Sequence, residues 1–222
     1  MTTRNQSIVS MKIEQTIISE DNLLLVAEFT YRERELRKEL KETCSKEVFK
    51  TYRPILKSFK STERRCEWMA SRIVCAGVEP NLPVVYDETG KPKMLGSNLE
   101  LSISHTEGMI AILFSTKGLP GVDIQLFSEN IERVAHKFAN DHELENKYKR
   151  VETLNTIWSA KEALYKIWGK QVYNFKRTLA IKKFRYEKNG KINAEILLND
   201  INHSIKLNYF THKQAVVVWA VH

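Results

Sequence analysis

The chain has 222 residues, 42% hydrophobic and 28% charged, which is the balance of an ordinary globular protein with a proper core. Its longest apolar stretches, at residues 109–114 and 215–221, are as long as strands and too short to cross a membrane, so no membrane partner is expected. The net charge of +8 favours an anionic partner, and nucleic acid, an acidic protein or a polyphosphate cofactor would each satisfy it.

Cysteine usage and the first residues bear on the cellular compartment. Three cysteines are an odd number, and no two of them lie at metal-binding spacing. Residues 1–15 contain no apolar secretory region. We therefore expect a cytoplasmic protein with free thiols.

The chain is predicted to begin with strands and continue with helices. Residues 8–18 and 22–29 indicate a first strand region. Residues 31–59 are charged and largely helical, and Pro54 is expected to interrupt or start a segment there. These elements would form the beginning of a first structural half.

The next helix has clear signals at both ends. Residues 61–75 carry an apolar stripe at helical spacing. Ser61 or Thr62 can cap its start, and Gly77 is expected to end it.

From residue 84 the pattern changes to strands. Residues 84–86 precede the turn sequence DETGKP at 87–92. Residues 99–104 alternate between apolar and polar side chains, which predicts a half-buried strand. Residues 109–114 read as its buried partner, and GVDIQ at 121–125 follows as another strand.

The second part of the chain repeats this order in outline. Helices are predicted over residues 131–138 and 141–168. Strands are predicted at residues 182–186, 192–196, 205–210 and 214–221. Asn189-Gly190 lies between the first two and indicates a hairpin turn. The fold class is therefore α+β, with two similar halves at 1–116 and 117–222, each with an antiparallel sheet and packed helices.

Two segments carry the chemistry that the residues alone suggest. Asp123 and Gln125 share the polar, and presumed wet, face of the strand GVDIQ. In WSAKEALYK (158–166), Glu162 and Lys166 lie side by side on a helix, and Lys161 is adjacent. Two carboxylates from separate elements, flanked by lysines, suit a Mg²⁺ ion shared with a phosphate-bearing substrate.

These segments also resemble a known family. WSAKEALYK and GVDIQ are similar to the W/F-S-x-K-E-A/S-x-x-K and G-I/V-D-I/V-E motifs of the 4′-phosphopantetheinyl transferases. Further similar segments, in the family's order, are ERRCEWMASR (63–72), GKP (90–92), SISHT (102–106) and FANDHE (138–143). The length resembles that of the two-halved, monomeric Sfp-type class.

The resemblance implies an enzyme, a holo-[acyl-carrier-protein] synthase. It would transfer the phosphopantetheine arm of coenzyme A to a serine of an apo acyl or peptidyl carrier protein, with Mg²⁺, and release adenosine 3′,5′-bisphosphate. It also implies an active site at the interface between the two halves, and hence a monomer. Carriers of fatty-acid, polyketide, nonribosomal-peptide and lysine pathways all fit.

The resemblance assigns the metal site and the catalytic groups. Asp123 and Glu162 would bind Mg²⁺ together with the coenzyme A pyrophosphate. Glu162 would remove the serine proton, directly or through a metal-bound water, and Lys166 would steady the pyrophosphate. Gln125 stands where many members have a Glu. A neutral amide can offer its carbonyl oxygen or hold a metal-bound water, so two carboxylate ligands are expected rather than three.

The resemblance also assigns contacts to coenzyme A. Ser104, His105 and Lys91 would contact its phosphates, and Lys166 would share this role. Lys161 would be a supporting charge.

Other residues of the motifs have simpler interpretations. Trp158 and Tyr165 are expected to be core-facing anchors. Glu143 could be an ordinary acid of a first helical turn, or lie near the metal site as in the family. Arg64, Arg65 and Arg72 are most simply a solvated helix face, although Arg64 or Arg65 could bind the coenzyme A 3′-phosphate.

Two alternatives belong to other functional classes. A basic nucleic-acid-binding module would use the +8 charge, but the basic residues are interleaved with acids and no recognition motif appears, so no nucleic acid is expected. A catalytically weak relative that only binds coenzyme A or a carrier is suggested by Gln125. Against it, Asp123, Glu162 and Lys166 are all present.

Overall fold

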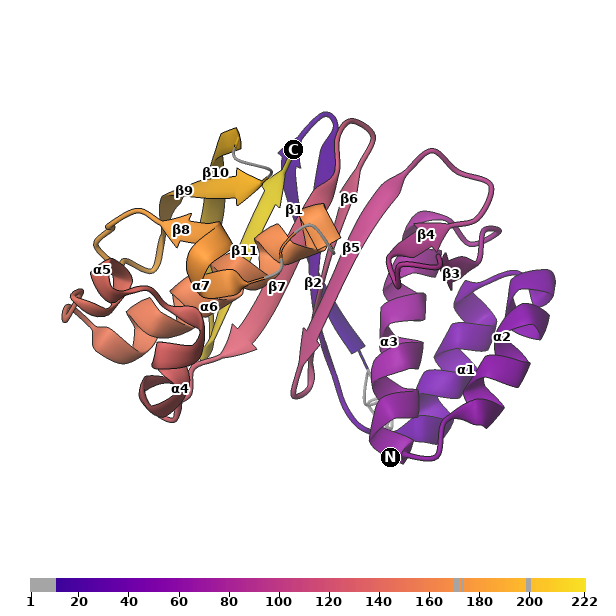
Figure 1. Cartoon of the computed structure of the whole chain (residues 1–222). Helices are drawn as coiled ribbons and strands as arrows, with labels where there is room; N and C mark the ends of the chain where they lie inside the picture. Colours follow the sequence, from indigo (N-terminus) through magenta and orange to yellow (C-terminus); the bar gives the residue numbers. More distant parts are fainter. Residues whose placement is uncertain (1–10, 170–171, 173, 199–200) are drawn as a thin grey trace.

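The computed structural model describes residues 11–169, 172, 174–198 and 201–222. Two sheets face each other in the middle of the molecule, and each carries helices on its outer side (Figure 1). The layers therefore run helices, sheet, sheet, helices. The predicted α+β class, with antiparallel sheets and packed helices, is confirmed.

The first sheet and its helices come from the part of the chain before residue 116. Its strands pair in the order β1-β2-β6-β5-β4-β3, each antiparallel to its neighbour. The elements are β1 (Met11–Ser19), β2 (Asn22–Phe29), α1 (Glu33–Thr43), α2 (Lys46–Ser58), α3 (Thr62–Val78), β3 (Val84–Tyr86), β4 (Pro92–Met94), β5 (Glu100–Thr106) and β6 (Met109–Ser115). Helices α1, α2 and α3 cover the outer face.

The second sheet and its helices follow. The order of its strands is β7-β11-β10-β9-β8, again antiparallel throughout. The elements are β7 (Pro120–Leu126), α4 (Ile131–Phe138), α5 (Asp141–Leu144), α6 (Arg150–Trp168), α7 (Phe175–Thr178), β8 (Leu179–Ile181), β9 (Asn189–Leu198), β10 (Ile201–His212) and β11 (Ala215–Val221). Helix α6 is the long helix that packs on β7 and β11.

An apolar layer joins the two sheets. Leu24, Ala111 and Leu113 of the first sheet meet Val122 and Val217 of the second, and all five side chains are buried. Side chains alternate along a strand, so the next residues on β7 point the other way, toward α6. This alternation places Asp123 beneath that helix.

Two predicted helix boundaries were wrong. Pro54 lies inside α2, which continues past it to Ser58. Gly77 lies inside α3, which ends at Val78. A Cβ at Gly77 would meet nothing within 4 Å, so this glycine marks no tight turn. The start of α3 was correct: Ser61 caps it by accepting a hydrogen bond from the Arg64 amide.

The predicted Asn189-Gly190 hairpin was also wrong. Both residues lie within β9, where Gly190 pairs with Tyr209. A Cβ at Gly190 would come within 2.9 Å of the Tyr209 ring, so the glycine makes room for that ring. Residues 182–186 form no strand, and β8 pairs with β9 before them, at Leu179–Ile181.

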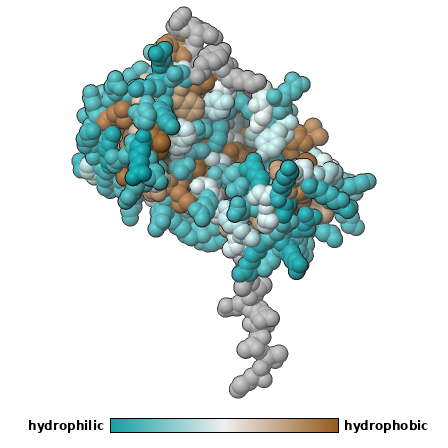
Figure 2. Space-filling model, turned by 60° about the horizontal axis from the view of Figure 1, so that its bottom comes forward, coloured by the Kyte–Doolittle hydropathy of each residue, from teal (hydrophilic) through white to brown (hydrophobic). Residues whose placement is uncertain are grey.

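One face of the molecule is mainly polar. Hydrophilic residues cover most of the face in Figure 2, and apolar residues appear there only in small patches. No helix among the described residues is long and apolar enough to span a membrane. Cys44, Cys66 and Cys75 are free thiols and are buried.

Candidate active site

Helix α6 lies directly on β7 because the strand has a glycine at the point of contact. A Cβ on Gly121 would stand only 2.2 Å from the Ala163 carbonyl oxygen and 2.7 Å from Ile167 Cγ1. No other residue type permits this approach without a shift of the helix. The glycine of GVDIQ therefore brings the helix of WSAKEALYK to the strand.

Asp123 is held by both halves of the molecule. Its Oδ1 accepts hydrogen bonds from Ser104 Oγ of β5 at 2.7 Å and from Lys166 Nζ of α6 at 3.0 Å. The lysine also donates to the Val122 carbonyl at 2.7 Å. The strand face predicted to be wet is instead covered by α6, and Asp123 is only 6% exposed.

Glu162 is electrostatically coupled to Asp123. Burial raises the pKa of Glu162 to about 7, the negative charge of Asp123 contributes to this rise, and Lys166 opposes it. Near neutral pH this carboxyl group therefore exchanges readily between its acid and its base form. Such a group can take up a proton during a reaction at physiological pH.

The donor set at this point fits a hard divalent cation. Within the ranges that the structure describes, no group of three or more His, Cys, Asp or Glu side chains is arranged to hold a metal. Mg²⁺ is commonly held by one or two carboxylates and completes its shell with water and substrate phosphates. Asp123 and Glu162 provide two carboxylates whose repulsion a cation would relieve.

Gln125 lies on the same strand face as Asp123, one pleat further along. Its amide nitrogen donates to the Leu126 carbonyl at 3.1 Å. The side chain also lines a separate cavity of about 360 Å³ between α4 and α6, which Val134 and Trp158 line as well. Part of Gln125 thus faces a space other than that around Asp123.

A second cavity, of about 290 Å³, lies where the two halves meet. Its wall includes Arg64, Lys91 and His105 from the first half and Tyr165, Lys166 and Gly169 from the second. Asp123 and Glu162 are not part of this wall, but Lys166 joins it to Asp123. The wall of the cavity thus carries several basic side chains, and one of them, Lys166, binds Asp123. Tyr165 was expected in the core, yet it is 38% exposed and lines this cavity.

Lys91 crosses from the first half to the end of α6. Its Nζ donates to the Ile167 carbonyl at 2.7 Å. The turn that carries it is fixed by Asp87, whose Oδ1 accepts from the Thr89 and Lys91 amides at 2.8 and 3.0 Å. The Thr89 hydroxyl adds a further bond, and these contacts lower the pKa of Asp87 to about 2.

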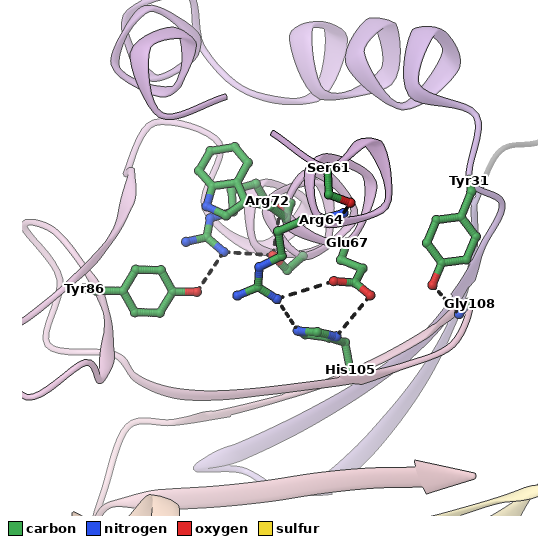
Figure 3. Close-up of polar contacts among 10 residues, drawn as sticks. Tyr31, Ser61, Arg64, Glu67, Arg72, Tyr86, His105 and Gly108 are labelled. Atoms are coloured by element: carbon green, nitrogen blue, oxygen red, sulfur yellow. Dashed lines mark hydrogen bonds and ion pairs between the residues drawn. The ribbon is translucent and has the colours of Figure 1, made fainter. Parts of the chain in front are cut away.

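Ser104 and His105 point to opposite faces of β5. Ser104 faces the second half, whereas His105 faces α3 (Figure 3). There His105 Nε2 lies 2.8 Å from Arg64 Nη1, and His105 Nδ1 lies 3.7 Å from a Glu67 carboxylate oxygen. A guanidinium can only donate, so Nε2 accepts and the ring proton of a neutral His105 is assigned to Nδ1, toward Glu67.

Arg64 and Arg65 also differ in direction. Arg65 donates to Glu33 at 2.9 Å and to the Phe59 carbonyl at 2.7 Å. Arg64 instead lines the cavity beside His105. The structure thus separates the two arginines that the sequence left as alternatives.

Lys161 is not where coenzyme A could reach it. Its side chain has no exposed surface, and its Nζ donates to the Phe138 carbonyl at 2.8 Å, to Glu143 at 2.8 Å and to the Phe175 carbonyl at 3.3 Å. The expected role as a supporting charge for coenzyme A is therefore corrected to an internal ion pair. Ile157 and Leu164, four and three residues away, lie on the same buried helix face.

Glu143 is the other member of this buried pair. It accepts from Lys161, from the Asn140 amide at 2.8 Å and from the Ile181 amide at 2.7 Å. These contacts fix the positions of α5, α6 and β8 relative to one another. Trp158 packs nearby between the rings of Phe138 and Phe175.

Sequence reasoning missed Glu67, and its prediction that Arg72 lies on a solvated helix face was wrong. Glu67 contacts Arg64 and His105, two residues that line the cavity. Arg72 is 2% exposed and lies over the rings of Trp68 and Tyr86. For Glu67, the signal in the sequence was its position three residues after Arg64 on one helix.

Comparison with known proteins identifies the second half. Residues 120–220 match the family model of the 4′-phosphopantetheinyl transferase superfamily. This match agrees with the superfamily that the motifs of residues 121–166 predict, whereas GKP, SISHT and the Arg-rich helix lie outside the matched residues.

Curated relatives agree with this match. The chain is 31% identical over 115 residues to the 4′-phosphopantetheinyl transferase AcpT of Salmonella typhi, and equally so to that of Salmonella typhimurium. Each alignment covers 48% of this chain and 60% of the relative. The chain thus matches 60% of the length of these relatives, which is less than two thirds.

Proposed function

We propose that the chain transfers the 4′-phosphopantetheine arm of coenzyme A to a serine hydroxyl of an apo carrier protein and releases adenosine 3′,5′-bisphosphate. The observation that carries the proposal is the cavity between the halves with Arg64, Lys91 and Lys166 in its wall, because Lys166 also binds Asp123, whose charge acts on Glu162. Phosphoryl transfer depends mainly on positioning and on neutralising charge, and this arrangement supplies both. The superfamily match supports the same reaction.

Coenzyme A would lie along the cavity with its nucleotide toward the first half. Arg64 and His105 would bind the 3′-phosphate at one end. Lys91 and Lys166 would contact the pyrophosphate, each with donors left over from its contact to a carbonyl. Ser104 would act on these phosphates only through Asp123, because its hydroxyl is already bonded there.

Asp123 and Glu162 would hold Mg²⁺, which would neutralise charge on the pyrophosphate when bound. Gln125 is proposed to contribute at most its carbonyl oxygen or a held water. The two carboxylates must be ionised to act as ligands. Lys166 Nζ lies 3.0 Å from Asp123 Oδ1 and leaves the other carboxylate oxygen of Asp123 for the cation.

The transfer itself needs a base and a stabilised leaving group. The carrier serine oxygen forms a bond to the phosphorus that carries pantetheine, and the bond from that phosphorus to the bridging oxygen breaks. Glu162 takes the serine proton, directly or through a water. Lys166 and Lys91 stabilise the negative charge on the departing bisphosphate.

We also propose that one chain is sufficient, as in the Sfp-type class. Ser104 and Lys91 of the first half reach Asp123 and Ile167 of the second within the same molecule. A monomer in a cytoplasmic setting, with its thiols free, is consistent with these contacts.

The test combines the protein, Mg²⁺, coenzyme A and apo carrier proteins from several pathways, with the carrier weighed by mass spectrometry. A gain of one phosphopantetheine arm is expected. Glu162→Gln and Asp123→Asn should each lower the rate at least about a hundredfold, whereas Glu152→Gln, the same change on the same helix, should not. If no carrier gains mass, the transferase is wrong; salt-dependent binding to generic DNA would then favour the nucleic-acid alternative.

A further inference from the structure

An acid, Glu67, lies beside the two cavity-lining groups that are proposed to bind phosphate, Arg64 and His105. Glu67 lies 3.4 Å from Arg64 Nη1 and 3.7 Å from His105 Nδ1 (Figure 3). Its side chain is 19% exposed, so it is partly shielded from solvent. An Arg64–Glu67 pair at i,i+3 is ordinary on a helix. The contact with His105 is less usual, because His105 lies on β5, forty-one residues away from Arg64.

The Glu67 carboxylate affects which charge state of a phosphate ligand can bind beside Arg64 and His105. With a neutral His105, the three side chains carry no net charge. A phosphate monoester is mostly a dianion above pH 7, since its second pKa is about 6. It would be drawn to Arg64 but repelled by Glu67 at short range. Protonation of His105 would offset that repulsion and give the phosphate a second donor.

We propose that Glu67 is a specificity-determining residue: it pairs with Arg64 and His105 in the free protein, and admits a phosphate monoester there only together with a proton on His105. The inference rests on the proposed function, because it takes the ligand to be the 3′-phosphate of coenzyme A. It adds that recognition of this phosphate is linked to pH. Coenzyme A lacking the phosphate would bind without the proton.

The surroundings of His105 support a neutral ring in the free protein. Burial lowers its pKa below the usual value, and Arg64 and Lys166 act in the same direction. Glu67 and Asp123 oppose the shift. A bound dianion would raise the pKa again. A ligand that raises a pKa takes up protons, and by reciprocity its affinity falls as the pH rises.

Calorimetry can test this without metal or carrier. Binding of coenzyme A and of dephospho-coenzyme A is measured in buffers of different ionisation enthalpy between pH 6 and pH 8. The wild-type protein should take up about one proton with coenzyme A, and its affinity should fall by up to about tenfold between pH 7 and pH 8. Dephospho-coenzyme A should show neither effect.

Variants separate the role of Glu67 from a structural one. Glu67→Gln should bind coenzyme A about fivefold more tightly at pH 8 because the repulsion is gone, with dephospho-coenzyme A unchanged. His105→Asn should abolish the proton uptake. Glu63→Gln, the same change at an exposed site of the same helix, should behave as the wild type. Thermal unfolding of each variant verifies folding.

The outcomes distinguish this inference from the proposed function. Equal proton uptake with both ligands, or a Glu67→Gln variant with an unchanged preference for coenzyme A, would overturn the role of Glu67 even if arm transfer occurs. If coenzyme A binds with proton uptake but no carrier gains the arm, the proposed transferase function is wrong and the role of Glu67 stands. Binding of neither ligand would overturn both.

Discussion

Ser104 Oγ donates a 2.7 Å hydrogen bond to Asp123 Oδ1, and this bond connects β5 of the first sheet to β7 of the second. A neighbouring bond runs parallel to it, from the Val122 amide to Ser102 Oγ at 3.1 Å. Two serines of one strand therefore fix the other strand at the site of the carboxylate pair.

Removal of the Ser104 hydroxyl should weaken the site more than the fold. In Ser104→Ala, Asp123 keeps Lys166 but loses a bond to a charged acceptor, which is worth about 1.5–3 kcal/mol. We expect about a tenfold lower kcat/KM and a higher Mg²⁺ requirement. Ser102→Ala is the matched control and should lower stability without changing the Mg²⁺ requirement. Equal Mg²⁺ dependence in both variants would contradict the role of Ser104.

Gly121 should tolerate no side chain. In Gly121→Ala the new methyl group would press on the Ala163 carbonyl and push α6 away from β7. Overpacking of this kind costs about 1–3 kcal/mol, and the displaced Glu162 should lose most of the activity. Chemical denaturation and the transfer assay measure the two effects.

Gly77→Ala provides the comparison for this change. Gly77 is helical and has open space around it, so alanine should raise stability by about 0.5–1 kcal/mol. A Gly121→Ala protein as stable and active as Gly77→Ala would disprove the close contact between helix and strand.

The raised pKa of Glu162 makes the metal-free protein sensitive to pH. Its folded pKa of about 7 lies above the ordinary glutamate value of 4.5, so the folded state binds more protons between these two pH values. Stability should therefore fall as pH rises from 4.5 to 7, and remain lower above 7. Glu162→Gln should lack this component, which thermal unfolding at pH 5 and pH 8 would reveal. Parallel pH profiles of the two proteins would refute the shift.

Mg²⁺ should reverse that sensitivity. The cation and the proton compete for the same carboxylate, so added Mg²⁺ should raise the unfolding temperature more at pH 8 than at pH 5. Proton release on Mg²⁺ binding near pH 7, measured in weakly buffered solution, gives an independent readout. Its absence would mean that Glu162 is not a ligand.

The Lys161–Glu143 pair should matter for stability as a unit. Lys161→Met or Glu143→Gln leaves one buried group unpaired, and loss of one partner of such a pair costs about 3–5 kcal/mol. The double variant should be less unstable than the sum of the single ones. Urea denaturation of the four proteins measures the coupling, and strict additivity would show that the two side chains act separately.

The strands and helices around the carboxylate pair could largely be predicted from the sequence, because alternation and helical spacing are local signals. The sequence did not predict which face of each strand or helix is buried. Asp123 reads as solvent-facing in GVDIQ, but α6 covers it, and the signal for that contact is the single glycine at position 121. Lys161 was misjudged for the same reason: a lysine on an apolar helix face was taken for a surface charge.

Long-range pairing explains the remaining differences. Asn189-Gly190 has the local chemistry of a hairpin turn, but Tyr209 from β10 takes the space that Gly190 leaves. The proposed role of Glu67 depends on its contact with His105, which lies on a different element. Neither partner can be recognised from its neighbours along the chain.

The bond from Lys91 to the Ile167 carbonyl has a consequence for motion. Ile167 is in the last turn of α6, so the two halves cannot separate there without exposing an unpaired carbonyl at the end of this helix. A pyrophosphate held by both Lys91 and Lys166 would join the same two halves a second time. Ligand binding should therefore slow hydrogen exchange in the last turn of α6. The bound substrate would hold the two sheets together, and its release would loosen them again.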